Sequence, residues 1–281
     1  MMKKKRMHRI LGIILAISLP LAIISGITIG VMATNEVKDV IWNRSKNVLS
    51  SNYVTATADA KEITKLNITN PIGKVIILPT TDDVASIDYN DEYVNANFTN
   101  DTLIVKEVNK KFWRHNWFVY NPFDDIIITI KLPLKLTDVT IEGGAGEISL
   151  SGFSIDNLDI GGGIGTIDIN NCTINKTANI DSGVGSVRLF NNTGTPNYKI
   201  EQGVGEINLK NVTANNIDIN GGVGATKLDT ITANDVSIEG GVGSIKINNS
   251  TIKRLSGSQG LGEINVDKNT TVEENRLGFS D

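Results

Sequence analysis

The chain has 281 residues, 40% of them hydrophobic and 5% aromatic, and a formal net charge of −4 at pH 7. This length suits one large domain or two small ones. Five of its 27 basic residues lie among the first nine, where there is no acidic residue, so the remainder has 22 basic against 31 acidic residues. Such an acidic remainder argues against nucleic-acid binding. The lone cysteine, Cys172, cannot form an internal disulfide and is expected to be a small buried residue.

The N-terminal region combines a basic tail, residues 1–9, with an uncharged apolar stretch, residues 10–33. A membrane span needs about 20 apolar residues, whereas the apolar core of a secretory signal peptide has about 7–15. We therefore predict an uncleaved transmembrane signal anchor at 10–33, with a signal peptide cleaved after Ala33 as the alternative. By the positive-inside rule, both place the rest of the chain outside the cytoplasm. The expected location is the cell membrane, crossed once, with an extracytoplasmic C-terminal domain.

The polar residues 34–61 are expected to form a juxtamembrane stalk. Beyond it, residues 66–77 repeat the apolar positions of residues 158–169 at a constant shift of 92, with Pro71 in place of a glycine. Self-similarity of this kind is the sequence signature of a repeat architecture. It predicts a degenerate first coil at 62–79.

An insertion over residues 80–136 separates this coil from the regular repeats. Runs of alternating apolar residues, with turn-forming Asn-Asp pairs between some of them, predict strands within it. These strands are expected at 85–89, 93–99, 103–108 and 126–132.

Large rings concentrate between the last two of these strands, where residues 110–123 hold six of the 15 aromatic residues of the chain. Rings beside basic groups favour contact with lipid headgroups, glycans or a partner protein. The candidate binding surface consists of Trp113, Arg114, Trp117, Phe118 and Tyr120. The alternative is that the rings pack on the open end of the repeat and cover an edge strand.

Residues 137–270 contain seven Gly-hydrophobe-Gly triplets, whose first glycines are residues 144, 163, 183, 203, 222, 241 and 260. They are 19 or 20 residues apart, and a fixed period of this size is typical of a solenoid. Around each triplet, apolar residues alternate with polar ones as in β-strands. We predict an all-β, single-chain β-solenoid of seven coils, each with a strand, a glycine corner, a second strand and a polar corner. A C-terminal tail is expected at 271–281.

Two rows of side chains are expected to stack from coil to coil. The middle residues of the triplets are apolar and are expected to point inward: Ala145, Ile164, Val184, Val204, Val223, Val242 and Leu261. The polar corners are expected to carry a ladder of hydroxyl groups: Ser154, Thr173, Thr193, Thr213, Thr232, Thr251 and Thr270.

The residues of the repeat offer little for catalysis. A calcium-binding nonapeptide needs an aspartate after its glycines, but the corresponding residue here is Ile167, and the period is twice too long. Glu147, Glu206 and Glu263 recur at one position but are separated by two or more coils. Glycoside chemistry requires clustered carboxylates, and no triad or metal-binding spacing is evident. We therefore predict no catalytic residue, no metal site and no cofactor, and a protein that is not an enzyme.

Residues 126–150, with a strand ending in Leu132-Pro133 that leads into short strands punctuated by Gly-x-Ile-like corners, resemble a bacterial cell-envelope family. This family of unknown function is known as toast-rack or "putative adhesin" and includes LiaG-like and YvlB-like proteins. The resemblance covers most of residues 62–270. It implies a membrane-anchored, surface-exposed β-repeat protein linked to adhesion or to envelope-stress responses, and it brings no catalytic residues with it.

Together these features predict a membrane-anchored, extracytoplasmic β-solenoid that serves as a non-catalytic binding, adhesion or scaffolding module of the bacterial cell envelope. Its expected partners are the membrane itself, through the N-terminal helix, and a cell-wall glycan, a lipid or a membrane protein. The alternative is an accessory component of an envelope-stress sensing system. Since the basic tail is too short for a signalling domain, such a component requires a partner in the membrane.

Overall fold

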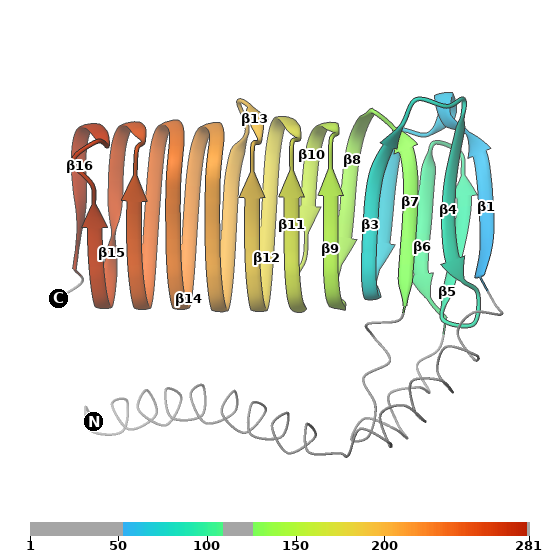
Figure 1. Cartoon of the computed structure of the whole chain (residues 1–281), viewed down its shortest axis with the longest axis horizontal. Coiled ribbons are helices and arrows are strands. Elements are labelled where there is room, and N and C mark those ends of the chain that lie inside the picture. The colour runs from blue at the N-terminus through green and yellow to red at the C-terminus, as the bar shows by residue number, and fades with distance from the viewer. Residues whose placement is uncertain (1–52, 109–125, 280–281) are drawn as a thin grey trace, which may run out of the picture. The chain divides into compact units, whose positions relative to one another are not determined.

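The computed structural model describes residues 53–108 and 126–279. The predicted signal anchor at 10–33 and the five residues of the predicted aromatic surface lie outside these ranges. Within them, no helix is long and apolar enough to cross a membrane. The described residues form an all-β solenoid of about seven turns, as the repeat predicted (Figure 1).

Residues 53–108 and 126–279 contain one short 3-10 helix, η1 (Ala60–Glu62), and sixteen strands. The strands are β1 (Tyr53–Asp59), β2 (Lys65–Thr69), β3 (Ile72–Thr80), β4 (Val84–Asn90), β5 (Val94–Thr99), β6 (Thr102–Glu107), β7 (Ile127–Pro133), β8 (Lys135–Glu142), β9 (Ala145–Ser151), β10 (Ser154–Ile160), β11 (Ile164–Asn170), β12 (Thr173–Phe190), β13 (Thr193–Gly194), β14 (Asn197–Asn248), β15 (Thr251–Val266) and β16 (Thr271–Phe279).

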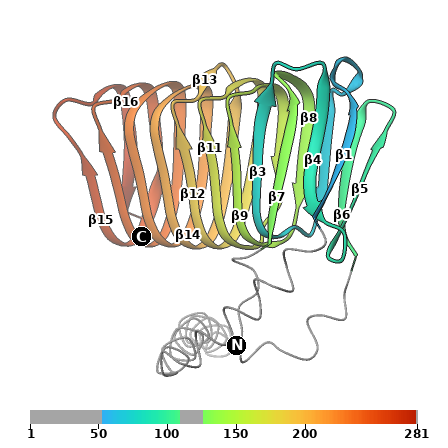
Figure 2. The same cartoon turned by 45° about the vertical axis from the view of Figure 1, so that its right-hand side comes forward.

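Each coil is flattened into two faces, a cross-section that the sequence left open. β12 pairs in parallel with β10 through Thr173–Ile180 on one face, then turns at Gly183 and pairs with β11 through Val184–Phe190 on the other. β14 is long because several successive coils run through it with extended backbone at their corners. Both views show the coils side by side with their wide faces parallel (Figures 1 and 2).

The core is built by in-register stacking of alternate side chains. Ile160, Ile180 and Ile200 are opposite one another on adjacent coils, and all are buried. Burying such aliphatic side chains stabilises the fold by about 1.5–3 kcal/mol each. Where one coil carries a large residue, its neighbour is small: Tyr198 is opposite Ala178, and both are fully enclosed.

The N-terminal end is closed by strands that leave the parallel pattern. β2 and β3 stack on β8 and β9, with Gly73 opposite Gly146. β6 and β7 then extend the two faces in parallel, and β5, β4 and β1 complete them in antiparallel pairs. The strands expected in the insertion are present, and they lie beside the first coil as an additional turn with an antiparallel cover.

The C-terminal end differs from the expected tail. Thr271–Phe279 form β16, which pairs in register with β15. Thr251 is opposite Thr271 rather than Thr270, because the last turn is one residue longer. The side chain of Thr270 is only partly buried, and its hydroxyl accepts a hydrogen bond from the Ser250 N–H at 3.3 Å. Side chains of this coil, such as Ile264 and Val272, are only partly buried.

Candidate binding surface

The glycine corner requires glycine because adjacent coils approach very closely there. Gly165 has φ of +138°, and a Cβ on it would lie 1.8 Å from the carbonyl oxygen of Gly146. No side chain fits in that space, and L-residues rarely adopt that φ. The second glycine of each triplet is therefore fixed by backbone contact between coils.

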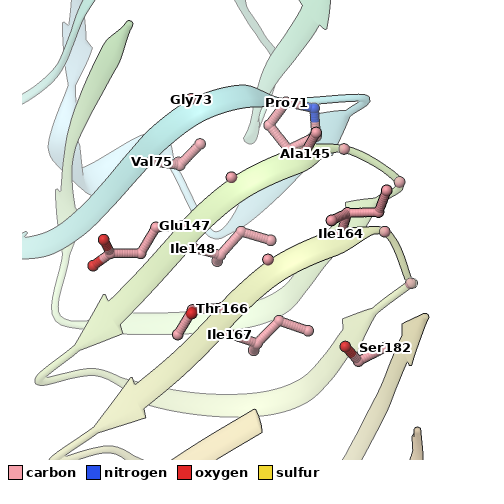
Figure 3. Close-up of a pocket in the computed structure, with 16 residues that line it drawn as sticks. Pro71, Gly73, Val75, Ala145, Glu147, Ile148, Ile164, Thr166, Ile167 and Ser182 are labelled. Carbon is pink, nitrogen blue, oxygen red and sulfur yellow. The ribbon is translucent and has the colours of Figure 1, made fainter. Parts of the chain in front are cut away.

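The middle residue of the triplet points outward, and the inward orientation expected from its apolar character is wrong. Ile164 is 64% exposed, Val223 39% and Leu261 68%. The second strand of the coil sets the orientation: Ile167 is buried, so the residue three positions earlier faces the opposite side. In Figure 3, Ile148 and Ile167 lie on one side of their strands and Glu147 and Thr166 on the other.

These middle residues form a continuous row on the solenoid edge, which we call the aliphatic ladder. Ala145, Ile164, Val184 and Val204 are paired in register, as are Val242 and Leu261. Neighbouring members are about 4.8 Å apart, the spacing of paired strands. The aliphatic ladder consists of Ala145, Ile164, Val184, Val204, Val223, Val242 and Leu261.

The edge that carries the ladder, here called the glycine edge, also holds other exposed apolar groups. Tyr53 and Ile127 are in contact there, and the Ile127 N–H donates to the Tyr53 hydroxyl at 3.0 Å. Val108 lies at the same edge, because it follows the end of β6, where Lys106 is opposite Thr69. Phe279 is opposite Gln259, next to the last triplet. Nine of the thirteen exposed large apolar side chains of the described residues lie on this edge: Tyr53, Val108, Ile127, Ile164, Val184, Val223, Val242, Leu261 and Phe279.

Three chain segments also reach this edge. β1 and β7 begin there and β6 ends there, at the lower edge of the solenoid in Figure 1. β1 and the start of η1 lie within the segment predicted as the stalk, 34–61, and the predicted aromatic surface comes between β6 and β7 in the sequence. The chain before β1 and the segment between β6 and β7 therefore connect to the solenoid at its apolar edge.

Charged residues flank the ladder and are predominantly acidic. Lys74 pairs with Glu147 at 3.0 Å and Lys227 with Glu206 at 2.8 Å, which neutralises two acids on one flank. On the other flank, four of the coils carry further acidic residues, Glu142, Asp181, Glu201 and Glu239, of which Glu201 pairs with Lys199 at 2.7 Å. The glycine edge therefore combines an apolar line with a mildly acidic border.

The opposite edge, which we call the asparagine edge, is polar. Asn171, Asn191 and Asn211 have φ of +54°, +56° and +55°, and their side chains bond in series, with Asn191 Nδ2 to Asn171 Oδ1 at 3.2 Å and Asn211 Nδ2 to Asn191 Oδ1 at 3.0 Å. Asparagine tolerates this left-handed conformation better than most residues. Beside it, the expected hydroxyl ladder is seen between Thr173 and Thr193, whose oxygens are 3.1 Å apart.

Cys172 has a structural role at this edge. It is buried as expected, and its N–H donates to Asn192 Oδ1 at 2.9 Å. The amide of Asn192 in turn donates to the Ile169 carbonyl at 2.8 Å. Burial raises the pKa of the Cys172 thiol, so the neutral form is favoured. These contacts satisfy corner backbone groups and do not activate the thiol.

Three hollows among the described residues are water-sized. The largest of the three, about 20 Å³, lies at the glycine corner between Pro71, Val75, Ile148 and Ile167 (Figure 3). Two further hollows hold about 10 Å³ each. A cavity needs about 10–15 Å³ to hold one water molecule, whereas small-molecule sites occupy hundreds of Å³. These three hollows are too small for a small-molecule ligand.

No group of three or more His, Cys, Asp or Glu side chains that could hold a metal ion is present in the described ranges. The strongest pKa shift there belongs to Tyr198, whose pKa is raised by burial, and its hydroxyl is enclosed without a hydrogen-bond partner in the core. That position is a packing site and not a cleft. Titratable groups with shifted pKa values at an active site would instead face an accessible hollow.

The described residues form a repeat-built β-solenoid with an exposed aliphatic row on one edge, and the sequence comparison assigns its family. The profile described as the N-terminal domain of toast_rack, DUF2154, matches residues 43–190, more than half of the chain. The chain belongs to this family, and the resemblance seen in the sequence is confirmed. No curated protein sequence matches the chain.

Several solved structures resemble the chain. A putative adhesin from Bacteroides fragilis is 20% identical, with a TM-score of 0.41, covering 82% of this chain and 98% of its own. A putative lipid binding protein from Parabacteroides distasonis is 11% identical, with a TM-score of 0.43 and the same coverage. A putative adhesin from Parabacteroides merdae is 14% identical, with a TM-score of 0.35, again covering 82% and 98%.

Proposed function

We propose that this protein is a non-catalytic binding module of the bacterial cell envelope, anchored by its N-terminal segment and binding through the glycine edge. The observation that carries the proposal is that nine of the thirteen exposed large apolar side chains of the described residues lie on one edge of the solenoid. Large exposed apolar patches on soluble domains mark interaction sites. The predicted aromatic surface adds to this edge in the proposal, because the strands on either side of it meet the solenoid there.

The same observations disfavour catalysis by the described residues. Enzymes place perturbed titratable groups in a concave pocket from which water can be excluded. Here the hollows are water-sized, and the buried polar side chains support the corner backbone. A stiff row of repeated side chains suits contact with an extended or repetitive partner.

The test is co-sedimentation of residues 34–281, which contain every described strand, with isolated cell-wall sacculi and separately with phospholipid vesicles. Three double variants accompany the wild type: Trp113→Ala/Trp117→Ala, Val204→Asp/Val242→Asp on the glycine edge, and Thr193→Asp/Thr232→Asp on the asparagine edge. The last two add the same charge at corner positions on opposite edges, where Val204 is partly buried and the other three residues are exposed.

The proposal predicts that wild type pellets with at least one of the two materials. It also predicts that the Val204→Asp/Val242→Asp protein loses most of this pelleting and that the Thr193→Asp/Thr232→Asp protein keeps it. Loss with Trp113→Ala/Trp117→Ala at unchanged thermal stability assigns the aromatic residues to binding, and a large loss of stability assigns them to packing. Absence of wild-type pelleting with both materials, or equal loss in both aspartate variants, would overturn the proposal.

A further inference from the structure

We propose that the glycine edge lies on the surface of a phospholipid bilayer, with the aliphatic ladder at the level of the lipid headgroups and upper acyl chains. The inference rests on the proposed function and names its partner. It places the long axis of the described solenoid along the membrane plane, with the asparagine edge facing away.

The first argument is the linear arrangement of the apolar groups. The seven ladder residues, from Ala145 to Leu261, form one row over the regular repeat, with members on neighbouring coils about 4.8 Å apart, and five of them are exposed. A compact protein partner would match a patch, whereas a planar interface matches a line of any length. The ladder side chains are short aliphatic groups, and each has a glycine before and after it. Because glycine has no side chain, the edge of the solenoid is narrow there, and the aliphatic groups can enter between lipid headgroups without steric hindrance.

The second argument is the position of the chain before Tyr53. Tyr53 begins β1 at the glycine edge, and 52 residues precede it, including the uncharged stretch predicted to span the membrane at 10–33. The 19 intervening residues, 34–52, reach at most about 68 Å when fully extended. A tether of this length raises the effective concentration of the edge at the bilayer, so weak contacts by individual ladder residues are sufficient.

The third argument is charge. The acidic residues beside the ladder, such as Glu142, Asp181 and Glu239, give no attraction to anionic headgroups. Contact with lipid must then come from the aliphatic side chains, and it should be strongest with zwitterionic phosphatidylcholine and insensitive to salt. Surface electrostatic attraction would show the opposite salt response.

The experiment uses the full-length protein reconstituted into phosphatidylcholine vesicles. Cys172 is first replaced by valine, the residue found at the equivalent corner position 212. An environment-sensitive fluorophore is then attached to either a Val223→Cys or a Thr213→Cys variant. These positions are the glycine and polar corners of one coil and are separated by a strand of about 25 Å. Quenching by lipids spin-labelled near the headgroup is compared with quenching by aqueous iodide.

The expected result is lipid quenching at least threefold stronger for the Val223→Cys label than for the Thr213→Cys label, with the reverse order for iodide. Adding Val204→Asp/Val242→Asp should lower the lipid quenching at position 223 to the level at position 213, whereas Thr193→Asp/Thr232→Asp should leave it unchanged. The difference should persist in 1 M NaCl, and replacing part of the phosphatidylcholine by phosphatidylglycerol should reduce it.

Equal lipid quenching at the two positions, or loss of the difference at high salt, would overturn the inference. A Val223→Cys label that is shielded from lipid and iodide alike would also overturn it, because a second copy or another protein would then cover the ladder. These failures are distinguishable from failure of the proposed function: a protein that still pellets with sacculi through the glycine edge remains a binding module whose partner is the wall.

Discussion

The two edges of the solenoid turn the chain in the same way but present different surfaces. Both corners use residues with positive φ, glycine at Gly165 and Gly185 and asparagine at Asn171 and Asn191. The need for a positive φ at each corner therefore explains the glycines and the asparagines. It does not explain the aliphatic residue between the glycines, since an exposed extended position accepts threonine as readily as valine. The apolar character of that residue is the part of the repeat that folding leaves unexplained.

The largest expected effect is at the glycine corner itself. In Gly185→Ala, the new Cβ would lie 1.7 Å from the Gly165 carbonyl oxygen at a φ of +144°. Displacing the coil and straining the backbone should lower the free energy of unfolding by roughly 3 kcal/mol or more, measured by urea denaturation. Gly278→Ala is the matched control, because nothing lies within 4 Å of its Cβ, and it should change stability by less than about 0.5 kcal/mol. Equal effects in the two variants would refute the close-approach explanation.

The asparagine corner should be more tolerant. Asn191→Ala places an alanine in the left-handed region and removes both amide contacts to Asn171 and Asn211. We expect a loss of about 1–2 kcal/mol, mostly from backbone strain. Asn191→Gly removes the same amide contacts but relieves the strain, so it should be the more stable of the two variants. If the glycine variant is as destabilised as the alanine variant, the amide ladder and not the backbone is the main contribution.

Substitutions on the aliphatic ladder should leave the fold nearly unchanged. Val204 and Val242 are at least partly exposed, so Val204→Asp/Val242→Asp should alter the free energy of unfolding by less than about 0.5 kcal/mol per site. Thermal and urea unfolding beside the Thr193→Asp/Thr232→Asp control measure this. A loss of several kcal/mol confined to the valine variant would mean that the ladder is part of the core after all.

The smallest effect concerns pH at the N-terminal end of the asparagine edge. The Lys65 ammonium, followed by the hydroxyls of Thr102 and Thr64, lowers the pKa of Asp101. A lowered folded pKa contributes stability that is present above the ordinary carboxyl pKa of about 3.9 and is lost as the pH falls through the folded value. The stability difference between wild type and Asp101→Asn should therefore be small at pH 7 and decrease below pH 4. A difference that does not change between pH 7 and pH 2 would contradict this assignment.

The sequence was sufficient to predict the solenoid, because in-register stacking repeats the same residue classes every 19 or 20 positions. It also predicted the burial of Cys172. The prediction was wrong for the middle residue of the triplet. Counting in steps of two from Ile160 in the preceding strand turns Ile164 inward, whereas counting back from Ile167 in the following strand turns it outward. The positive φ at Gly165 resolves the conflict in favour of the following strand, and a side-chain pattern does not contain that information.

The ends of the solenoid were less predictable than its middle. The strands of the insertion follow from their alternation, but the antiparallel pairing of β4 with β7 and of β5 with β6 occurs once and leaves no period. The extra residue near Thr270, which shifts the register of the last coil, also occurs only once and leaves no period in the sequence. The aromatic surface around Trp113 and Trp117 remains a prediction. The seven residues of the aliphatic ladder were recognised in the sequence as one row, but with the wrong orientation.

The most direct test of the glycine edge as the binding edge is labelling in intact cells. In the Cys172→Val background, the Val223→Cys and Thr213→Cys variants are exposed to a membrane-impermeant maleimide, and initial labelling rates are compared before and after the envelope is dissolved in detergent. Our account predicts labelling at position 223 at least tenfold slower than at position 213 in cells, with near-equal rates in detergent. Equal rates in cells, unchanged by detergent, would show that the aliphatic ladder faces solvent and would contradict the account.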